Sequence, residues 1–186
     1  MRLLIAALAV LAAACSADVN TGRAAAVGEG YVLEVRATSG EQTYLVTAPD
    51  GRVVGARAAQ GASALMNGDS AQRLAADPPP QGDAPPEVMS LRLPGFDMAI
   101  SAEGDDSTEN GRASVSINAG DNRVIVNADE GGPGEADDRA YVRITGADAD
   151  AVRDFINDAE ELSPEVKAEM LAELGIAAAA PEGAQP

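Results

Sequence analysis

The chain has 186 residues and is strongly acidic, with 13 Lys and Arg against 30 Asp and Glu and a formal net charge of −17. A field of this sign repels phosphate backbones, which excludes nucleic acid as a partner. The sequence has no histidine, no tryptophan and a single cysteine, which excludes Ser-His and Cys-His catalytic pairs and zinc sites built from imidazole or paired thiolates. The chemistry that remains is that of carboxylates, hydroxyls, amides and arginines, and we expect no cofactor.

The first fifteen residues have the pattern of a leader. Met1-Arg2 is a short positive start, Leu3 to Leu11 is an apolar run, and small residues then lead to Cys15. This pattern, with Leu11-Ala12-Ala13-Ala14-Cys15 at its end, resembles the signal peptide of a bacterial lipoprotein. The resemblance implies diacylglycerol transfer to the Cys15 thiol, cleavage before this residue and acylation of the new amino terminus. Residues 1–14 would then be a signal peptide.

Two other interpretations of the leader stay open. An ordinary secretory signal cleaved after Ala12 or Ala14 would leave a free thiol, which is a liability in an exported protein. A retained anchor helix would need about 20 apolar residues, more than this run provides. We expect the membrane to be a partner through lipidated Cys15, because two or more acyl chains anchor a protein stably. Ser16 after the cysteine resembles lipoproteins sent to the outer membrane, where the protein would face the periplasm.

A flexible tether and a three-stranded meander are predicted next. Residues 15–30 are small, polar and without periodicity, which is typical of a tether. Residues 31–57 alternate with period two and contain two turn signals, Gly40-Glu41 and Pro49-Asp50-Gly51. The first turn predicts the pairs Val35–Val46, Ala37–Tyr44 and Leu33–Ala48. The second turn predicts the pairs Val46–Val54 and Tyr44–Ala56, on the same buried face.

Residues 58–87 lose the alternation and are expected to form a linker or crossing loop of a single domain that spans residues 31–176. A short helix within residues 64–76, after Asn67, Gly68 and Asp69, is compatible with the pattern. The prolines at 78–80 and 85–86 cannot continue this helix. We therefore expect an extended segment over residues 77–87.

A second strand series is predicted over residues 88–145. A two-residue loop at Pro94-Gly95 predicts the pairs Leu93–Phe96, Leu91–Met98 and Arg92–Asp97. A loop at Gly120-Asp121, with glycine first, predicts the pairs Ile117–Val124, Val115–Val126 and Ala113–Ala128. Residues 139–145 alternate as well and supply another strand.

Two helices are predicted over residues 148–175. Asp148 caps the first helix, Ser163 followed by Pro164 starts the second, and Gly175 ends it. Residues 177–186 are expected to be a disordered tail. The predicted fold class is α+β, an antiparallel meander of about eight strands with a C-terminal helical hairpin packed on it.

Acidic residues gather in two longer connections, residues 103–111 and 129–138. The tight turns at the opposite strand ends place both connections at one edge of the sheet, which brings nine carboxylates together: Glu103, Asp105, Asp106, Glu109, Asp129, Glu130, Glu135, Asp137 and Asp138. Hard cations such as calcium bind oxygen clusters of this kind, and the candidate ligands are Asp105, Asp106, Glu109, Asp129 and Asp137. Neither loop completes a calcium motif, since Ile117 stands where an EF-hand loop from Asp106 requires a bidentate Glu.

These observations leave three functional classes. A glycoside hydrolase would need its paired carboxylates in a low-dielectric cleft rather than in acidic loops, so we expect no enzyme. The leading hypothesis is a non-catalytic, lipid-anchored protein of the cell envelope whose sheet and acidic edge form an interaction or assembly surface for another envelope protein. The alternative is a divalent-cation (calcium) binding module that uses the acidic loops 103–111 and 129–138.

Overall fold

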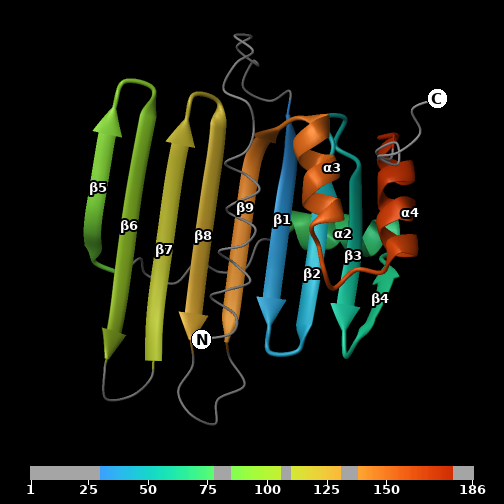
Figure 1. Cartoon of the computed structure of the whole chain (residues 1–186), viewed down its shortest axis with the longest axis horizontal. Coiled ribbons are helices and arrows are strands. Elements are labelled where there is room, and N and C mark those ends of the chain that lie inside the picture. The colour runs from blue at the N-terminus through green and yellow to red at the C-terminus, as the bar shows by residue number, and fades with distance from the viewer. Residues whose placement is uncertain (1–29, 78–84, 106–109, 131–137, 178–186) are drawn as a thin grey trace, which may run out of the picture.

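The computed structural model describes residues 30–77, 85–105, 110–130 and 138–177, which form one antiparallel sheet of nine strands with three helices. The strand order is β4-β3-β2-β1-β9-β8-β7-β6-β5 (Figure 1). The elements in chain order are β1 (Tyr31–Thr38), β2 (Glu41–Thr47), β3 (Val53–Ala59), β4 (Ala62–Leu65), α2 (Gly68–Ala76), β5 (Glu87–Leu93), β6 (Phe96–Asp105), β7 (Asn110–Ala119), β8 (Asn122–Glu130), β9 (Arg139–Ala147), α3 (Ala149–Asn157) and α4 (Pro164–Leu174).

The antiparallel sheet with C-terminal helices is confirmed, and the expected count of about eight strands is one too low. The additional strand is β4, which pairs with the end of β3 across a tight turn at Gln60-Gly61. The linker expected over residues 58–87 therefore contains a strand and a helix. Four residues of Ala, Ser and Leu are too few to display an alternation against their surroundings. The proline-rich residues 78–84 lie outside the described part of the chain.

The first hairpin has the predicted faces but a different register. Its loop is Ser39-Gly40, with Gly40 at a positive φ of 97°, so that Leu33 faces Val46 and Val35 faces Tyr44. The predicted pairs of β1 with β2 are wrong by two residues, because the glycine takes the second loop position and not the first. A shift of two residues leaves every side chain on its face, since strands alternate with period two. The predicted pairs of β2 with β3 are confirmed.

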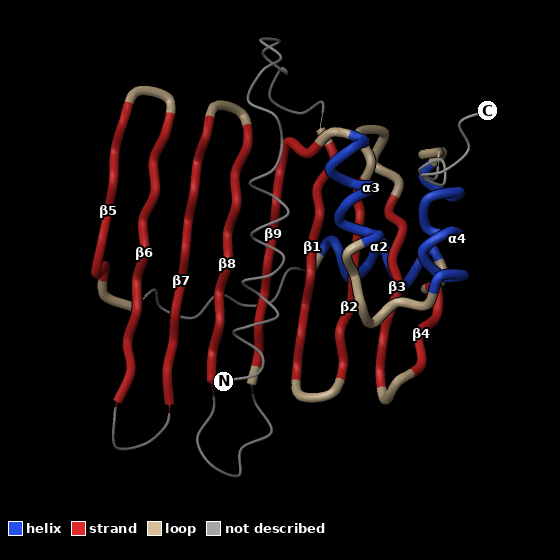
Figure 2. Tube along the Cα trace, in the orientation of Figure 1, coloured by secondary structure: helices blue, strands red, loops and turns tan. Residues whose placement is uncertain are grey.

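The second strand series has the predicted registers throughout. The pairs Leu93–Phe96, Leu91–Met98 and Arg92–Asp97 confirm the Pro94-Gly95 loop. The three pairs predicted around Gly120-Asp121 are also present, with Gly120 at a positive φ of 59°. The strand β9 then lies between β8 and β1 and joins the two series into one sheet, as the red tubes of Figure 2 show.

The three helices that the structure describes cover one half of the sheet. In Figure 1, α3 and α4 lie on one side of β1–β4 and α2 lies on the other side. We call the side under α3 and α4 the apolar face; it carries Leu33, Val35, Tyr44 and Val46, which are buried with Phe155, Ile156, Met170 and Leu174 of the two helices. The opposite, polar face receives α2, whose Ala71 packs on Leu45 and Val53.

The predicted caps of α3 and α4 are confirmed, and α2, for which no cap was predicted, begins in the same way. Asn67, Asp148 and Ser163 are the N-cap residues of α2, α3 and α4, and the side chain of each accepts a hydrogen bond from a backbone amide of the first turn. Gly175 ends α4 in the left-handed conformation. Against the sheet, Gly55 permits the close approach of α2, because a Cβ at this position would lie 2.7 Å from Leu45 Cδ2 and 3.3 Å from Ala71 Cβ.

Residues 1–29 and 178–186 lie outside the described residues, so the leader, Cys15, the tether and all but the first residue of the expected tail remain predictions. Among the helices that the structure describes, none has the length and apolar character needed to cross a membrane.

Candidate functional site

The two acidic connections begin and end at the same end of the sheet, as the sequence predicts. The tight turns after β5 and β7 lie at the opposite end, so the C-terminal ends of β6 and β8 stand together (Figure 1). Glu103 and Asp105 close β6, Asp129 and Glu130 close β8, and Asp138 precedes β9. The other four acids, Asp106, Glu109, Glu135 and Asp137, belong to the stretches that the structure does not describe.

Arginines accompany the acids at these strand ends. The carboxylate of Asp129 lies 3.5 Å from Arg112 Nε, and both side chains are about half exposed. Arg112 also stands opposite Glu103, and Arg139 stands opposite Asp129. The described residues contain no group of three or more His, Cys, Asp and Glu that could hold a metal ion. Of the five candidate ligands, Asp129 is thus in an ion pair and Asp105 is the last residue of β6, whereas Asp106, Glu109 and Asp137 lie outside the described residues.

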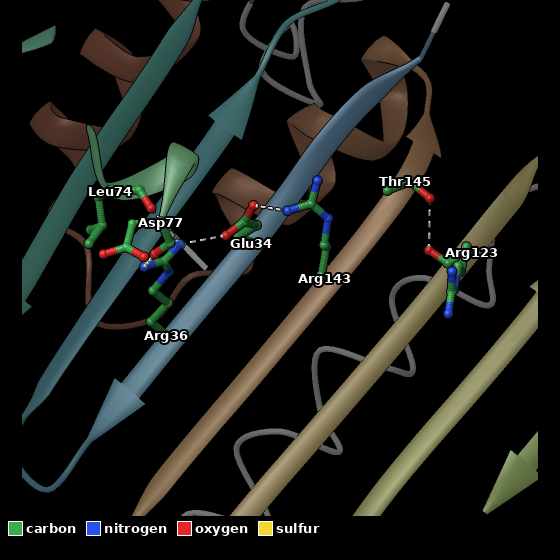
Figure 3. A network of polar contacts seen from close by, with 7 residues as sticks. All are labelled: Glu34, Arg36, Leu74, Asp77, Arg123, Arg143 and Thr145. Carbon is green, nitrogen blue, oxygen red and sulfur yellow. Dashed lines mark hydrogen bonds and ion pairs between the residues drawn. The ribbon is translucent and has the colours of Figure 1, made fainter. Parts of the chain in front are cut away.

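A buried charge cluster lies on the polar face, between the sheet and α2 (Figure 3). Glu34 is only 2 % exposed, and its carboxylate accepts hydrogen bonds from Arg143 Nη1 at 2.6 Å and from Arg36 Nη2 at 3.1 Å. The same Arg36 guanidinium donates to the carbonyl oxygens of Leu74 at 2.7 Å and Asp77 at 2.9 Å. It therefore binds two carbonyls at the C-terminal end of α2, and that of Leu74 also accepts a hydrogen bond from the backbone amide of Asp77 at 3.2 Å.

The contacts of this cluster indicate a structural role. A carboxylate out of contact with water is costly unless it is paired and hydrogen-bonded, and here both oxygens are occupied by guanidinium groups. Neither oxygen is presented to a substrate. Sequence reasoning missed the cluster, although the alternation of residues 31–38 places Glu34 and Arg36 on the face opposite Leu33. A charged residue in a strand predicts an exposed face, and α2 covers this one.

A second polar contact ties the α3–α4 connection to the sheet. The hydroxyl of Tyr44 donates to Glu161 Oε2 at 2.7 Å, and Gln42 Nε2 donates to Glu161 Oε1 at 3.0 Å. Burial raises the pKa of Tyr44, and the acceptor Glu161 raises this pKa further. The Tyr44 ring also packs edge-on against Phe155 of α3, with ring centroids 6.0 Å apart. These contacts fix the helical hairpin over β1–β4.

The apolar face continues beyond the helices. The strand pairings align a row of apolar residues across the sheet, each opposite the next: Val54, Val46, Leu33, Ile144, Val124, Ile117, Met98 and Leu91. A second row joins Ala56, Tyr44, Val35, Val142, Val126, Val115, Ile100 and Met89 in the same way. Of the described helices, α3 and α4 lie over the part of these rows that belongs to β1–β4 (Figure 1).

We call the part of the apolar face on β5–β8 the open half-face. It consists of Met89, Leu91, Leu93, Phe96, Met98, Ile100, Val115, Ile117, Val124 and Val126. Its exposure increases toward the edge strand: Val126 on β8 is 7 % exposed, whereas Leu91 and Leu93 on β5 are 43 % and 57 % exposed. All the exposed large apolar side chains of the described residues lie on β5. The sequence predicts the alternation of these strands, but it does not predict that the three described helices leave their apolar side uncovered.

Comparisons of this chain with protein-family models, with curated proteins and with solved structures gave no match. The functional conclusion therefore depends on the residues and surfaces described above.

Proposed function

We propose that this chain is a non-catalytic, lipid-anchored protein of the cell envelope that acts as an interaction or assembly module. The anchor is Cys15 at the end of the leader, and the location is the outer membrane, facing the periplasm. The observation that supports an interaction role is the open half-face. There the apolar rows of the hydrophobic core continue from β9 across β8, β7, β6 and β5, beyond the strands that α3 and α4 cover.

An apolar sheet face of this extent is normally covered by a second layer. A sheet buries one face against helices or another sheet, and contiguous exposed apolar patches on monomeric proteins usually mark interaction sites. The edge strand β5 supports the same role, because every one of its residues is exposed and, among the described strands, its backbone pairs with β6 alone. Edge strands of this kind are places where other chains add.

The interior polar groups support a non-catalytic role. General acid-base catalysis needs a carboxylate that reaches a substrate in a low-dielectric site. The buried carboxylate of the described residues, Glu34, contacts two arginines instead. Calcium binding is the alternative function, and no contact in the described residues favours it over the interaction role.

The anchor is tested with Cys15→Ser. We expect this variant to lose labelling by radioactive fatty acid, to escape normal cleavage and to leave the membrane fraction, because the thiol is the acylation site. Cys15→Ser protein that is processed and localised like the wild type would contradict the anchor.

The interaction role is tested by cross-linking in intact envelopes, followed by purification of the full chain. Leu91→Glu, on the open half-face, is expected to lose the cross-linked products of the wild type. Ser90→Glu, its neighbour on the polar face of β5, is the matched control and should keep them. If both variants retain the wild-type products, the open half-face is not the interaction surface.

A further inference from the structure

We infer that the open half-face is covered by the open half-face of a second copy of this chain, in a two-fold symmetric dimer with sheet packed on sheet. The inference rests on the proposed function in taking the half-face as an interaction surface, and it names the partner. Three observations carry it: the shape of the surface, its area and the distribution of charge.

The shape fits a second sheet. Helices α3 and α4 form a layer on the apolar face over β1–β4, and α3 packs against β1. Sheets stack at about 10 Å, so a second sheet over β5–β8 would continue the helical layer at about the same height. The half-face of a second copy is itself a surface of four strands with matched apolar rows. A two-fold axis places each half-face on the other, which closes the assembly at two copies.

The area is enough for a specific interface. Four strands about 4.8 Å apart, with about 3.3 Å per residue over eight or nine residues, make a face of about 500 Å². Two such faces remove about 1,000 Å² from water, which is the size at which specific interfaces begin. Burial of the exposed β5 side chains Met89, Leu91 and Leu93 would supply much of the gain, because these are the most exposed members of the surface.

The charge distribution selects the face and predicts a salt dependence. The ten residues that make up the open half-face are all uncharged, whereas the polar face of β5–β8 carries ion pairs such as Arg92–Asp97 and Arg112–Asp129. Two copies can therefore meet on the apolar face without burying a charge. Each copy has a net charge of −17, so the two repel at long range, and salt screens this repulsion. A basic partner protein would show the opposite dependence, because salt would weaken its attraction.

The first experiment measures the mass of the purified full chain in solution by light scattering and sedimentation, from about 1 to 100 µM. We expect a mass of two chains that depends on concentration, with a lower dissociation constant at about 0.5 M than at about 0.05 M salt. A single-chain mass over this whole range at both salt concentrations would overturn the inference. So would a dimer that weakens as salt is added.

Substitutions at two neighbouring residues of β6 test which face of the sheet forms the dimer interface. Met98→Glu places a carboxylate in the dimer interface of both copies and should raise the dissociation constant at least about 100-fold. Ala99→Glu points to the polar face and should leave the dissociation constant unchanged. An equal loss of dimer in both variants would overturn the assignment to the apolar face. If Met98→Glu does not fold, Leu93→Ser on the exposed edge strand takes its place, with an expected weakening of about 10-fold.

A cross-linking experiment is independent of affinity. With Cys15 replaced by Ala so that no other thiol reacts, Ile117→Cys and Ser116→Cys place a thiol on the apolar and the polar face of β7, and a bismaleimide with an arm of about 10 Å spans two stacked sheets. We expect covalent dimers from Ile117→Cys only; covalent dimers from Ser116→Cys alone would overturn the proposed packing. A dimer in a chain that is not lipid-labelled would contradict the anchor and leave the dimer standing. A lipid-labelled monomer would support the anchor and contradict the dimer. The failure of the dimer can therefore be distinguished from the failure of the anchor.

Discussion

Glu34 and Arg143 stand directly opposite each other where β1 pairs with β9, and the carboxylate of Glu34 accepts a hydrogen bond from Arg143 Nη1 at 2.6 Å. The other carboxylate oxygen contacts Arg36, which holds the end of α2. One buried carboxylate therefore links the first strand, the last strand and a helix of the polar face.

The substitution Glu34→Gln should destabilise the fold by about 3 kcal/mol, because it leaves Arg36 largely buried with no opposite charge. Arg143→Gln should cost less, about 1 kcal/mol, since the Arg143 side chain is 32 % exposed and Glu34 keeps Arg36 as its partner. Urea unfolding of the three proteins provides the comparison. Equal losses for both variants would show that the carboxylate is not the centre of the cluster.

Alkaline pH should destabilise the protein through Tyr44. The pKa of Tyr44 is raised above its ordinary value of 10.0 by burial and by Glu161. Below pH 10 this residue is protonated in the folded and the unfolded chain, and its contribution to stability is intact. Above pH 10 the unfolded chain releases the proton while the folded chain retains it. The free energy of unfolding therefore falls, by up to about 1.4 kcal/mol per pH unit.

Thermal melting between pH 9 and 11 measures this effect, with Tyr44→Phe expected to flatten the decline. The comparison variant is Tyr141→Phe. Burial raises the pKa of Tyr141 as well, but Arg143 and Arg36 lower it, so this variant should change the decline less. If Tyr141→Phe flattens the curve more than Tyr44→Phe, the pH dependence arises elsewhere than at Tyr44.

The energetic cost of introducing a charge on the apolar face should decrease from β9, in the main core, toward β5 at the edge of the sheet. Val142 is 3 % exposed in the main core, and Val142→Asp should cost more than 4 kcal/mol or prevent folding. Ile117 pairs with Val124 as predicted, but it is only partly buried, because none of the described helices lies over β7. We expect Ile117→Asp to cost about 1–2 kcal/mol in dilute solution. Equal melting temperatures for the two variants would refute this gradient.

The acidic strand ends should respond to ionic strength rather than to calcium. If the carboxylates repel one another, stability rises with salt through screening, equally for monovalent and divalent salts matched for ionic strength. A calcium site would instead saturate at low concentration and disappear when Asp105, Asp106, Asp129 and Asp137 are neutralised together. Calorimetry separates the two outcomes, and micromolar, saturable calcium binding would establish the alternative function.

The local parts of the fold could be predicted where a turn residue has one strongly preferred position. Gly120 must supply a positive φ at the start of its loop, and this fixes every pair of β7 with β8. Gly40 can take either loop position, and the first hairpin differs from its prediction by two residues for that reason. The helix caps at Asp148 and Ser163 are equally local and were predictable.

The long-range parts could not be predicted from the pattern. Alternation indicates that residues 139–145 form a strand and which side chains share a face, but it does not name the neighbouring strands. The place of β9 between β1 and β8 was therefore not predicted, and neither was the packing of the helix within residues 64–76 over Glu34. For the candidate site, strand direction correctly placed Glu103 and Asp129 at one end of the sheet. The absence of a helix over β5–β8, within the described residues, has no signal in the sequence of those strands.

The position of β9 has a consequence for how the chain can fold. The strands within β1–β4 and within β5–β8 follow one another in sequence, and in the described sheet the two groups are joined by β9, the last of the nine strands to be synthesised. Glu34 and Arg143 are 109 positions apart in sequence, and closing so long a loop is slow. Until residues 139–147 emerge, β1 and β8 each keep an open edge. A chain that completes its sheet so late holds two separate groups of paired strands during most of its synthesis, and these become one sheet only when β9 is added.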